Sequence, residues 1–354
     1  MKKFLSVIMA AALAVSMAAC SSSGDTNSTT AAAGSSDAAG SSDAAGSSDA
    51  AEGETVAPTG VKMTMGTGGT SGTYYAFGGV LGQYIKNKAG IDVTVVATDG
   101  SKADIQGIDA GDYQLGTVQS DVMAYAWDGV KAFADDGALD TFRVVGGLYA
   151  ETVQLVTLNP DIKTPEDLKG KAVSIGAPGS GVYFNAMDVL GAAGLTENDI
   201  KAQYLSFADS AEGLKDGKID AAFLVAGAPT PAITELATSN QIYLVPIEGD
   251  TAKAIIDECP YYTELAIPAG TYSGQDEDVN TITVKATLIV SADADEDSVY
   301  ALTKAIYENA DAIATEHSKG AELSIENATT GMTAPFHKGA AKYFEEQGVT
   351  VEAE

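Results

Sequence analysis

One stretch of the chain, residues 63–75, reads Met63-Thr64-Met65-Gly66-Thr67-Gly68-Gly69-Thr70-Ser71-Gly72-Thr73-Tyr74-Tyr75. Its alternating start predicts a short strand, and its glycine- and hydroxyl-rich middle predicts a tight turn. The residues that follow place apolar or aromatic side chains on one helical face, at Tyr74, Phe77, Leu81, Tyr84 and Ile85. The first N–H groups of a helix lack intrahelical partners and lie at the positive end of its dipole, so we expect this turn to bind an anionic group.

A second loop of the same kind lies further along the chain, in Val173-Ser174-Ile175-Gly176-Ala177-Pro178-Gly179-Ser180-Gly181. On two separate lobes, the two loops would enclose a cleft for one small anion. Ser71 breaks a dinucleotide-binding fingerprint, Pro178 breaks a nucleophile elbow, and no phosphate-binding Gly-Lys-Ser/Thr run follows either loop. Turn geometry alone stays open as a simpler explanation of the glycines.

The N-terminus has the pattern of an export signal. Lys2 and Lys3 precede an apolar run that is too short to span a bilayer comfortably, and Met17-Ala18-Ala19-Cys20 ends it. This pattern resembles a bacterial lipoprotein signal over residues 1–20, in which Cys20 becomes the lipidated first residue. A plain secretory signal is the alternative. We predict an extracytoplasmic protein that is lipid-anchored to the outer face of the bacterial cytoplasmic membrane.

Residues 21–60 predict a tether. Gly34-Ser35-Ser36-Asp37-Ala38-Ala39 is repeated twice more, through Ala51, and Val56 is the only apolar residue larger than alanine in this segment. Such a composition cannot bury enough surface to fold. We expect a disordered linker between the membrane anchor and a globular body.

The charge of the chain limits its partners. The formal net charge is −29, which argues against nucleic acid and against anionic lipid surfaces. Arg143 is the single arginine. An arginine fork for a carboxylate is therefore either Arg143 or absent. His317 and His337 lack the spacing of a metal site, and we predict no metal and no cofactor.

The body of the chain alternates strands and helices, which predicts an α/β fold with parallel sheets. The expected strands are 61–65, 93–97, 113–118, 144–148, 153–158, 172–175, 202–205, 220–225, 242–247 and 281–291. The expected helices are 73–88, 102–110, 121–134, a short one from Thr164, 182–193, 210–216, 229–238, 297–314 and 334–347.

Extended crossovers at 153–158 and 283–291 would join two lobes. We place lobe I at 61–155 plus 285–354 and lobe II at 156–284. Together they would form a hinge-closing clamp with a two-strand hinge.

The run Gly66–Tyr75 resembles the opening motif of the TAXI family, the solute receptors of tripartite ATP-independent periplasmic (TRAP) transporters. Further similar motifs follow in the family's order: Val118-Gln119-Ser120-Asp121, Thr164-Pro165-Glu166-Asp167-Leu168-Lys169-Gly170-Lys171, Gly176-Ala177-Pro178-Gly179-Ser180-Gly181, Ala226-Gly227-Ala228-Pro229, Ile267-Pro268-Ala269-Gly270-Thr271-Tyr272 and Pro335-Phe336-His337-Lys338-Gly339-Ala340. Each motif is weak alone, whereas the ordered set, over roughly residues 61–345, is specific.

The resemblance implies a type II periplasmic binding protein-like fold, in which the ligand cleft lies between the two α/β lobes. It also implies capture of a small organic anion, either a glutamate-like amino acid or a dicarboxylate, and its delivery to a TRAP membrane permease. By motif position it implies ligand contacts at Gly69, Thr70, Tyr74, Thr98, Ser101, Gln119, Asp121, Ser180, Gly181 and Gly227. Whether Tyr74 or Tyr75 faces the cleft stays open, because the helical pattern favours Tyr75 and the family position favours Tyr74. Ala103-Asp104 and Val182 depart from the family pattern and favour a less charged solute.

Two other functions remain alternatives to a non-enzymatic receptor. One is a secreted, lipid-anchored hydrolase or oxidoreductase, and the broken motifs and scattered histidines argue against it. The other is a surface antigen without a small-molecule ligand. Ligand-dependent stabilisation of the purified protein would argue against that.

Overall fold

The computed structural model describes residues 56–354, which belong to one compact unit, Gly53–Glu354. The predicted signal, Cys20 and nearly all of the tether lie outside the described residues. Within residues 56–354, no helix is long and apolar enough to cross a membrane.

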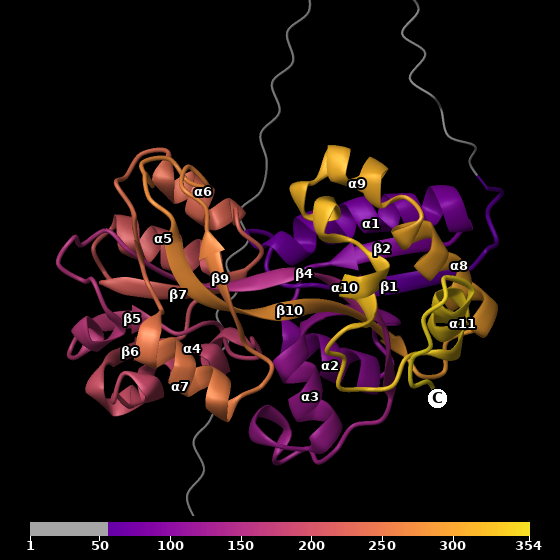
Figure 1. Cartoon of the computed structure of the whole chain (residues 1–354), viewed down its shortest axis with the longest axis horizontal. Coiled ribbons are helices and arrows are strands. Elements are labelled where there is room, and N and C mark those ends of the chain that lie inside the picture. The colour runs from indigo at the N-terminus through magenta and orange to yellow at the C-terminus, as the bar shows by residue number, and fades with distance from the viewer. Residues whose placement is uncertain (1–55) are drawn as a thin grey trace, which may run out of the picture. The chain divides into compact units, whose positions relative to one another are not determined.

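The predicted mixed α/β fold is confirmed: the described strands join in one sheet, in the order β2-β1-β3-β10-β4-β7-β5-β6, with β8 paired to β4 and β9 to β10. The long antiparallel strands β4 (Phe142–Thr157) and β10 (Val279–Ser291) run across the middle of this sheet (Figure 1). Their pairing places Thr152 opposite Thr283 and Tyr149 opposite Ala286. Every other strand is arranged around this central pair.

Parallel strands flank the central pair on both sides. On the first side, β1 (Lys62–Gly66) pairs with β2 (Asp92–Val96) and β3 (Leu115–Gln119). On the second side, β5 (Ala172–Ser174) pairs with β6 (Lys201–Gln203) and β7 (Ala221–Ala226). The two remaining strands are β8 (Tyr243–Val245) and β9 (Thr263–Ile267).

The buried apolar side chains form three cores, and these divide between the same two sides of the central strand pair. One core gathers buried side chains from Met63 to Tyr149 and again from Ala286 to Phe344. Two smaller cores gather those from Val153 to Val284. We call the elements of the first core the β1 side and those of the other two the β7 side. Strands β4 and β10 cross from one side to the other between these limits.

The helices of the β1 side are α1 (Thr73–Ala89), α2 (Ser101–Asp109), α3 (Ser120–Asp128), α8 (Glu296–Tyr307), α9 (Ala310–Glu316), α10 (Ile325–Thr329) and α11 (Lys338–Glu346). Those of the β7 side are α4 (Val182–Ala192), α5 (Phe207–Lys215), α6 (Pro231–Ala237) and α7 (Gly249–Glu258). The predicted helix start at Thr164 is confirmed as the 3₁₀ turn η2 (Pro165–Leu168), closed by a capping box between Thr164 and Asp167.

Three predictions of single elements were wrong. The strands expected at 144–148 and 153–158 form one continuous strand, because pairing with β10 carries β4 through the polar residues between them. The helix expected over 121–134 ends at Asp128, where Gly129 adopts φ 67°. The helix expected over 297–314 breaks into α8 and α9 at Asn309. Helices α7 and α10 and strand β9 were not predicted.

Candidate ligand-binding site

The carboxyl ends of parallel strands from both sides converge on one cavity. Open α/β sheets bind ligands at this place. The volume of this cavity is about 80 Å³. One buried water needs about 10–15 Å³, so the cavity has room for roughly five to eight waters. The lining residues are Gly68, Gly69, Gly72, Thr73, Tyr74, Thr98, Asp99, Gly100, Ser101, Gln119 and Glu151 from the β1 side and β4, and Ala177, Ser180, Gly181, Val182, Leu205, Ser206, Phe207, Val225 and Ala226 from the β7 side. The cavity suits a small solute.

Most of the predicted contact residues line this cavity. Loops that are far apart in the sequence bring together Gly69, Tyr74, Thr98, Ser101, Gln119, Ser180 and Gly181. Tyr74 faces the cavity and is 9% exposed, whereas Tyr75 is not among the lining residues. The structure therefore decides between the two tyrosines in favour of Tyr74.

The other predicted contacts lie outside the lining. Thr70 is exposed at the outer end of the first loop. Asp121 is fully buried beneath the cavity, where its Oδ2 accepts a hydrogen bond from Asn185 Nδ2 at 3.0 Å. The Gly227 carbonyl accepts a hydrogen bond from Thr73 Oγ1 at 2.7 Å, so Gly227 is used in holding the two sides together.

Five helices begin at the cavity. The residues that precede α1, α2, α3, α4 and α5 are Gly72, Gly100, Gln119, Gly181 and Ser206, and each lines the cavity. Of these, Ser206 alone caps its own helix with its side chain, by accepting from Asp209 N. Helix N-termini carry partial positive charge and N–H groups without intrahelical partners. At this cavity α2 donates two of these N–H groups to the Gly179 carbonyl and α4 donates one to Ser180 Oγ, so the remaining N–H groups and the dipoles act on a solute. Their convergence creates a favourable site for a carboxylate or a similar anion.

Direct hydrogen bonds hold the two sides closed over the cavity. Besides the Thr73–Gly227 bond, Ala232 N donates to Ser71 O at 3.1 Å. The carbonyl of Gly179 accepts from Lys102 N at 3.1 Å and from Ala103 N at 3.2 Å, at the start of α2. The structure therefore represents a closed form, in which the two sides meet across the cavity.

A buried polar network also joins the two sides next to the cavity. Asn185 Oδ1 accepts from Gln119 Nε2 at 2.6 Å, and Asn185 Nδ2 donates to Asp121 Oδ2 and, at 2.6 Å, to Tyr262 Oη. Burial raises the pKa of Asp121 to about 7, opposed by hydrogen bonds from the Val122 backbone and from Asn185. Asp121 thus positions Asn185, which in turn holds Gln119 at the cavity.

Glu151 is the most unusual lining residue, and the sequence reasoning missed it. It lies on β4 opposite Val284, where the strand passes from one core to the other, and it is 1% exposed. Neither of its carboxylate oxygens has a hydrogen-bond partner within residues 56–354, and the same holds for the hydroxyls of Tyr74 and Tyr149. Burial raises the pKa of Glu151 to about 8, opposed by the positive charge of Lys319. Glu151 is the single acidic residue of β4, and that was the signal that could have found it.

Basic side chains are absent from the cavity lining that the structure describes, and its ionisable carboxylates are Asp99 and Glu151. Arg143 lies at the start of β4, where its guanidinium contacts the Asp140 and Phe142 carbonyls and Glu354. The arginine fork is therefore absent from this cavity. Any anionic group of the solute would depend on helix N-termini and hydroxyls.

Known structures share this fold at low sequence identity. A protein of Bordetella bronchiseptica RB50 is 19% identical, with a TM-score of 0.51 over 80% of this chain and 89% of its own. The alkanesulfonate-binding protein SsuA from Xanthomonas axonopodis pv. citri, bound to MOPS, is 17% identical, with a TM-score of 0.46 over 82% of this chain and 92% of its own. A putative L-cystine ABC transporter from Listeria monocytogenes is 18% identical, with a TM-score of 0.47 over 75% of this chain and 98% of its own. The superposition on the Bordetella bronchiseptica protein supports the fold. None of the three similarities identifies a ligand of this protein.

A family model covers most of the chain. The model of the NMT1-like family matches residues 65–348. This range begins at the end of β1, ends just after α11 and contains every residue that lines the cavity. The chain belongs to the NMT1-like family.

Proposed function

We propose that this protein is an extracytoplasmic solute receptor that closes around one small organic acid. The observation that carries this proposal is the convergence of five helix N-termini on one small cavity between two hydrogen-bonded sides of the molecule. Helix N-termini bind anionic groups without any basic side chain. The two sides act as lobes that hinge about β4 and β10, and the solute supplies contacts that exist only in the closed form.

The transport partner is a TRAP membrane permease. The ordered set of motifs that resemble the TAXI receptors supports this partner. The solute is a glutamate-like amino acid or a dicarboxylate, in keeping with the helix N-termini and the small cavity. The receptor carries out no chemistry on its solute and releases it unchanged.

A lipid on Cys20 holds the receptor at the outer face of the cytoplasmic membrane, with residues 21–60 as a tether. The small residues before Cys20 and the composition of the tether support this arrangement. Cys20→Ala would release the protein from the membrane fraction into the soluble fraction. Mass spectrometry of the membrane-bound form would show the mass of the added lipid.

A solute screen tests the receptor function directly. The purified full chain is denatured, the released small molecules are identified by mass spectrometry, and each is returned to refolded protein in a thermal-shift assay. A true solute is recovered unchanged and stabilises the protein, by about 2.7 kcal/mol at a hundredfold its Kd. Chemical turnover of the solute would identify an enzyme, and the absence of any stabilising solute would contradict a receptor.

Reconstitution tests the transport partner. Proteoliposomes that contain the permease should accumulate the labelled solute only when this protein is present. Uptake should continue without ATP and stop when the ion gradient is collapsed. Uptake that depends on ATP would assign the receptor to another class of transporter.

A further inference from the structure

We propose that the solute carries a protonated amine as well as an anionic group, and that Glu151 is the residue that binds the amine. The solute is then an amino acid or another small amino acid-like zwitterion, and not a dicarboxylate. This inference rests on the proposed receptor function and selects between the two solute classes that it leaves open.

Glu151 needs a positively charged partner that the cavity lining does not provide. Its carboxylate is 1% exposed, and both oxygens lack hydrogen-bond partners among the described residues. A buried, ionised carboxylate without a partner is strongly unfavourable. The lining contains no lysine, arginine or histidine from residues 56–354. A cation from the solute would satisfy the carboxylate where it lies.

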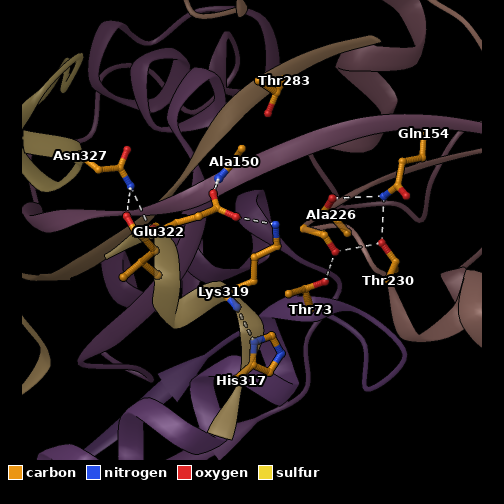
Figure 2. Close-up of polar contacts among 12 residues, drawn as sticks. Thr73, Ala150, Gln154, Ala226, Thr230, Thr283, His317, Lys319, Glu322 and Asn327 are labelled. Carbon is orange, nitrogen blue, oxygen red and sulfur yellow. Dashed lines mark hydrogen bonds and ion pairs between the residues drawn. The ribbon is translucent and has the colours of Figure 1, made fainter. Parts of the chain in front are cut away.

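Lys319 is the nearest protein cation to consider, and it already has a partner. Its Nζ donates to Glu322 Oε1 at 2.6 Å, and Glu322 Oε2 accepts from Ala150 N at 2.7 Å. Figure 2 shows this chain of contacts, with Lys319 and Glu322 reaching the β4 backbone at the residue before Glu151. Lys319 Nζ also lies 5.6 Å from the centroid of the Tyr149 ring. One lysine beside two glutamates cannot pair with both, and its ion pair is with Glu322, so Glu151 has no ion pair within residues 56–354.

The cavity lining therefore combines two opposite electrostatic preferences. The five helix N-termini favour an anion, whereas Glu151 and Asp99 favour a cation. A dicarboxylate would satisfy the first preference and oppose the second, because its charge would meet an unpaired carboxylate inside a small, closed space. A zwitterion satisfies both. The free hydroxyl of Tyr74 adds a hydrogen-bond group beside Glu151 that can bind either end of the solute.

Matched pairs of solutes test the inference on the unaltered full chain. Isothermal titration compares L-glutamate with glutarate, L-alanine with propanoate and L-leucine with 4-methylpentanoate. We expect at least one amino acid to bind, and its amine-free partner to bind roughly 30-fold more weakly or worse, as when one member of a buried charge pair is removed.

The variant Glu151→Gln tests whether Glu151 is the residue that causes this difference in affinity. We expect roughly 30-fold weaker binding of that amino acid, with binding of the amine-free partner unchanged or tighter. Glu345→Gln is the matched control, since Glu345 is exposed on α11 and does not line the cavity. It should change neither affinity.

The outcomes separate the inference from the receptor function. If amine-free acids bind as tightly as their amino acids, or if Glu151→Gln weakens both members of a pair equally, the inference is overturned and the receptor function stands. If neither the panel nor any co-purified solute binds, the receptor function fails and the inference fails with it. The wild-type comparison remains decisive even if Glu151→Gln does not fold.

Discussion

Single buried acidic side chains make the stability of the ligand-free protein depend on pH. Burial raises the pKa of Glu151 to about 8 and that of Asp121 to about 7, against values near 4 for exposed carboxyls. The folded chain thus holds protons that the unfolded chain has released between about pH 4 and pH 8. Since the folded state binds more protons in this window, the free energy of unfolding falls as pH rises through it.

We expect the ligand-free protein to lose stability between pH 5 and pH 8, by up to a few kcal/mol. Glu151→Gln should be more stable than the wild type at pH 8 and should show a smaller loss. Urea unfolding at both pH values measures the difference. An identical loss in the wild type and in Glu151→Gln would contradict the elevated pKa of Glu151.

Thr73 provides a test of closure at the level of one hydrogen bond. Thr73→Val removes one of the two hydrogen bonds that the Gly227 carbonyl accepts, and Thr230 Oγ1 still donates to it at 3.1 Å. We expect the loss to cost about 0.5–1.5 kcal/mol. We expect solute affinity to fall between about 2-fold and about 10-fold by titration calorimetry. Thr70→Val is the control, because exposed Thr70 does not line the cavity, and it should leave affinity unchanged. A larger loss of solute affinity in Thr70→Val than in Thr73→Val would indicate that the solute contacts Thr70, as the sequence predicted.

The start of helix α4 shows how one element depends on another. Gly181 precedes α4 with φ −71°, an ordinary value for any residue, so space and not backbone strain requires glycine here. A Cβ at this position would overlap Oε1 of Gln119, which comes from β3 on the other side of the cavity. Helix α4 can approach Gln119 this closely because the residue before it has no side chain.

Gly181→Ala should therefore keep the two sides apart. We expect solute affinity to fall at least about 10-fold, while each side stays folded. Gly191→Ala lies in the same helix, where an added Cβ meets nothing within 4 Å. It should leave affinity unchanged and raise stability by about 0.5–1 kcal/mol. Titration calorimetry and thermal unfolding compare the two variants, and equal affinities would contradict the required contact with Gln119.

At the scale of the described body, β4 and β10 are the long strands that continue from one core into the other. The other contacts between the two sides are hydrogen bonds, the packing of the Tyr125 ring against Phe184 and Tyr261, and the ion pair between Lys131 and Asp188, which are small beside the two separate cores. The closed form is therefore expected to depend on the solute. A solute that binds only the closed form shifts the population toward it in proportion to its difference in affinity.

Spin labels at Gln83→Cys in α1 and Glu235→Cys in α6, in a Cys259→Ala background, report on this closure. Both sites are exposed and lie on opposite sides of the cavity. We expect the distance distribution from pulsed electron resonance to become shorter and narrower when solute is added. A pair at Gln83→Cys and Glu345→Cys, both on the β1 side, should not change. Identical distributions with and without solute would exclude a hinge.

Much of the candidate site could be predicted because the sequence encodes it locally. The glycine-rich turns before α1 and α4 predict helix N-termini. Tyr74, Gln119 and Ser180, which line the cavity, all follow predicted strands. Glu151, Arg143 and Thr70 could not be placed in this way. Their roles depend on which face of a strand or loop meets a distant partner, and no local pattern records that.

The sequence by itself determined the alternation of strands and helices, the position of the glycine turns and the α/β class, because periodicity and turn chemistry act over a few neighbouring residues. Tertiary structure alone decided that β4 runs unbroken, that Arg143 lies away from the cavity and that Glu151 is buried within it. These features follow from the register of β4 against β10 and from the meeting of two cores. Such contacts join residues more than a hundred positions apart, as in the pairing of Glu151 with Val284.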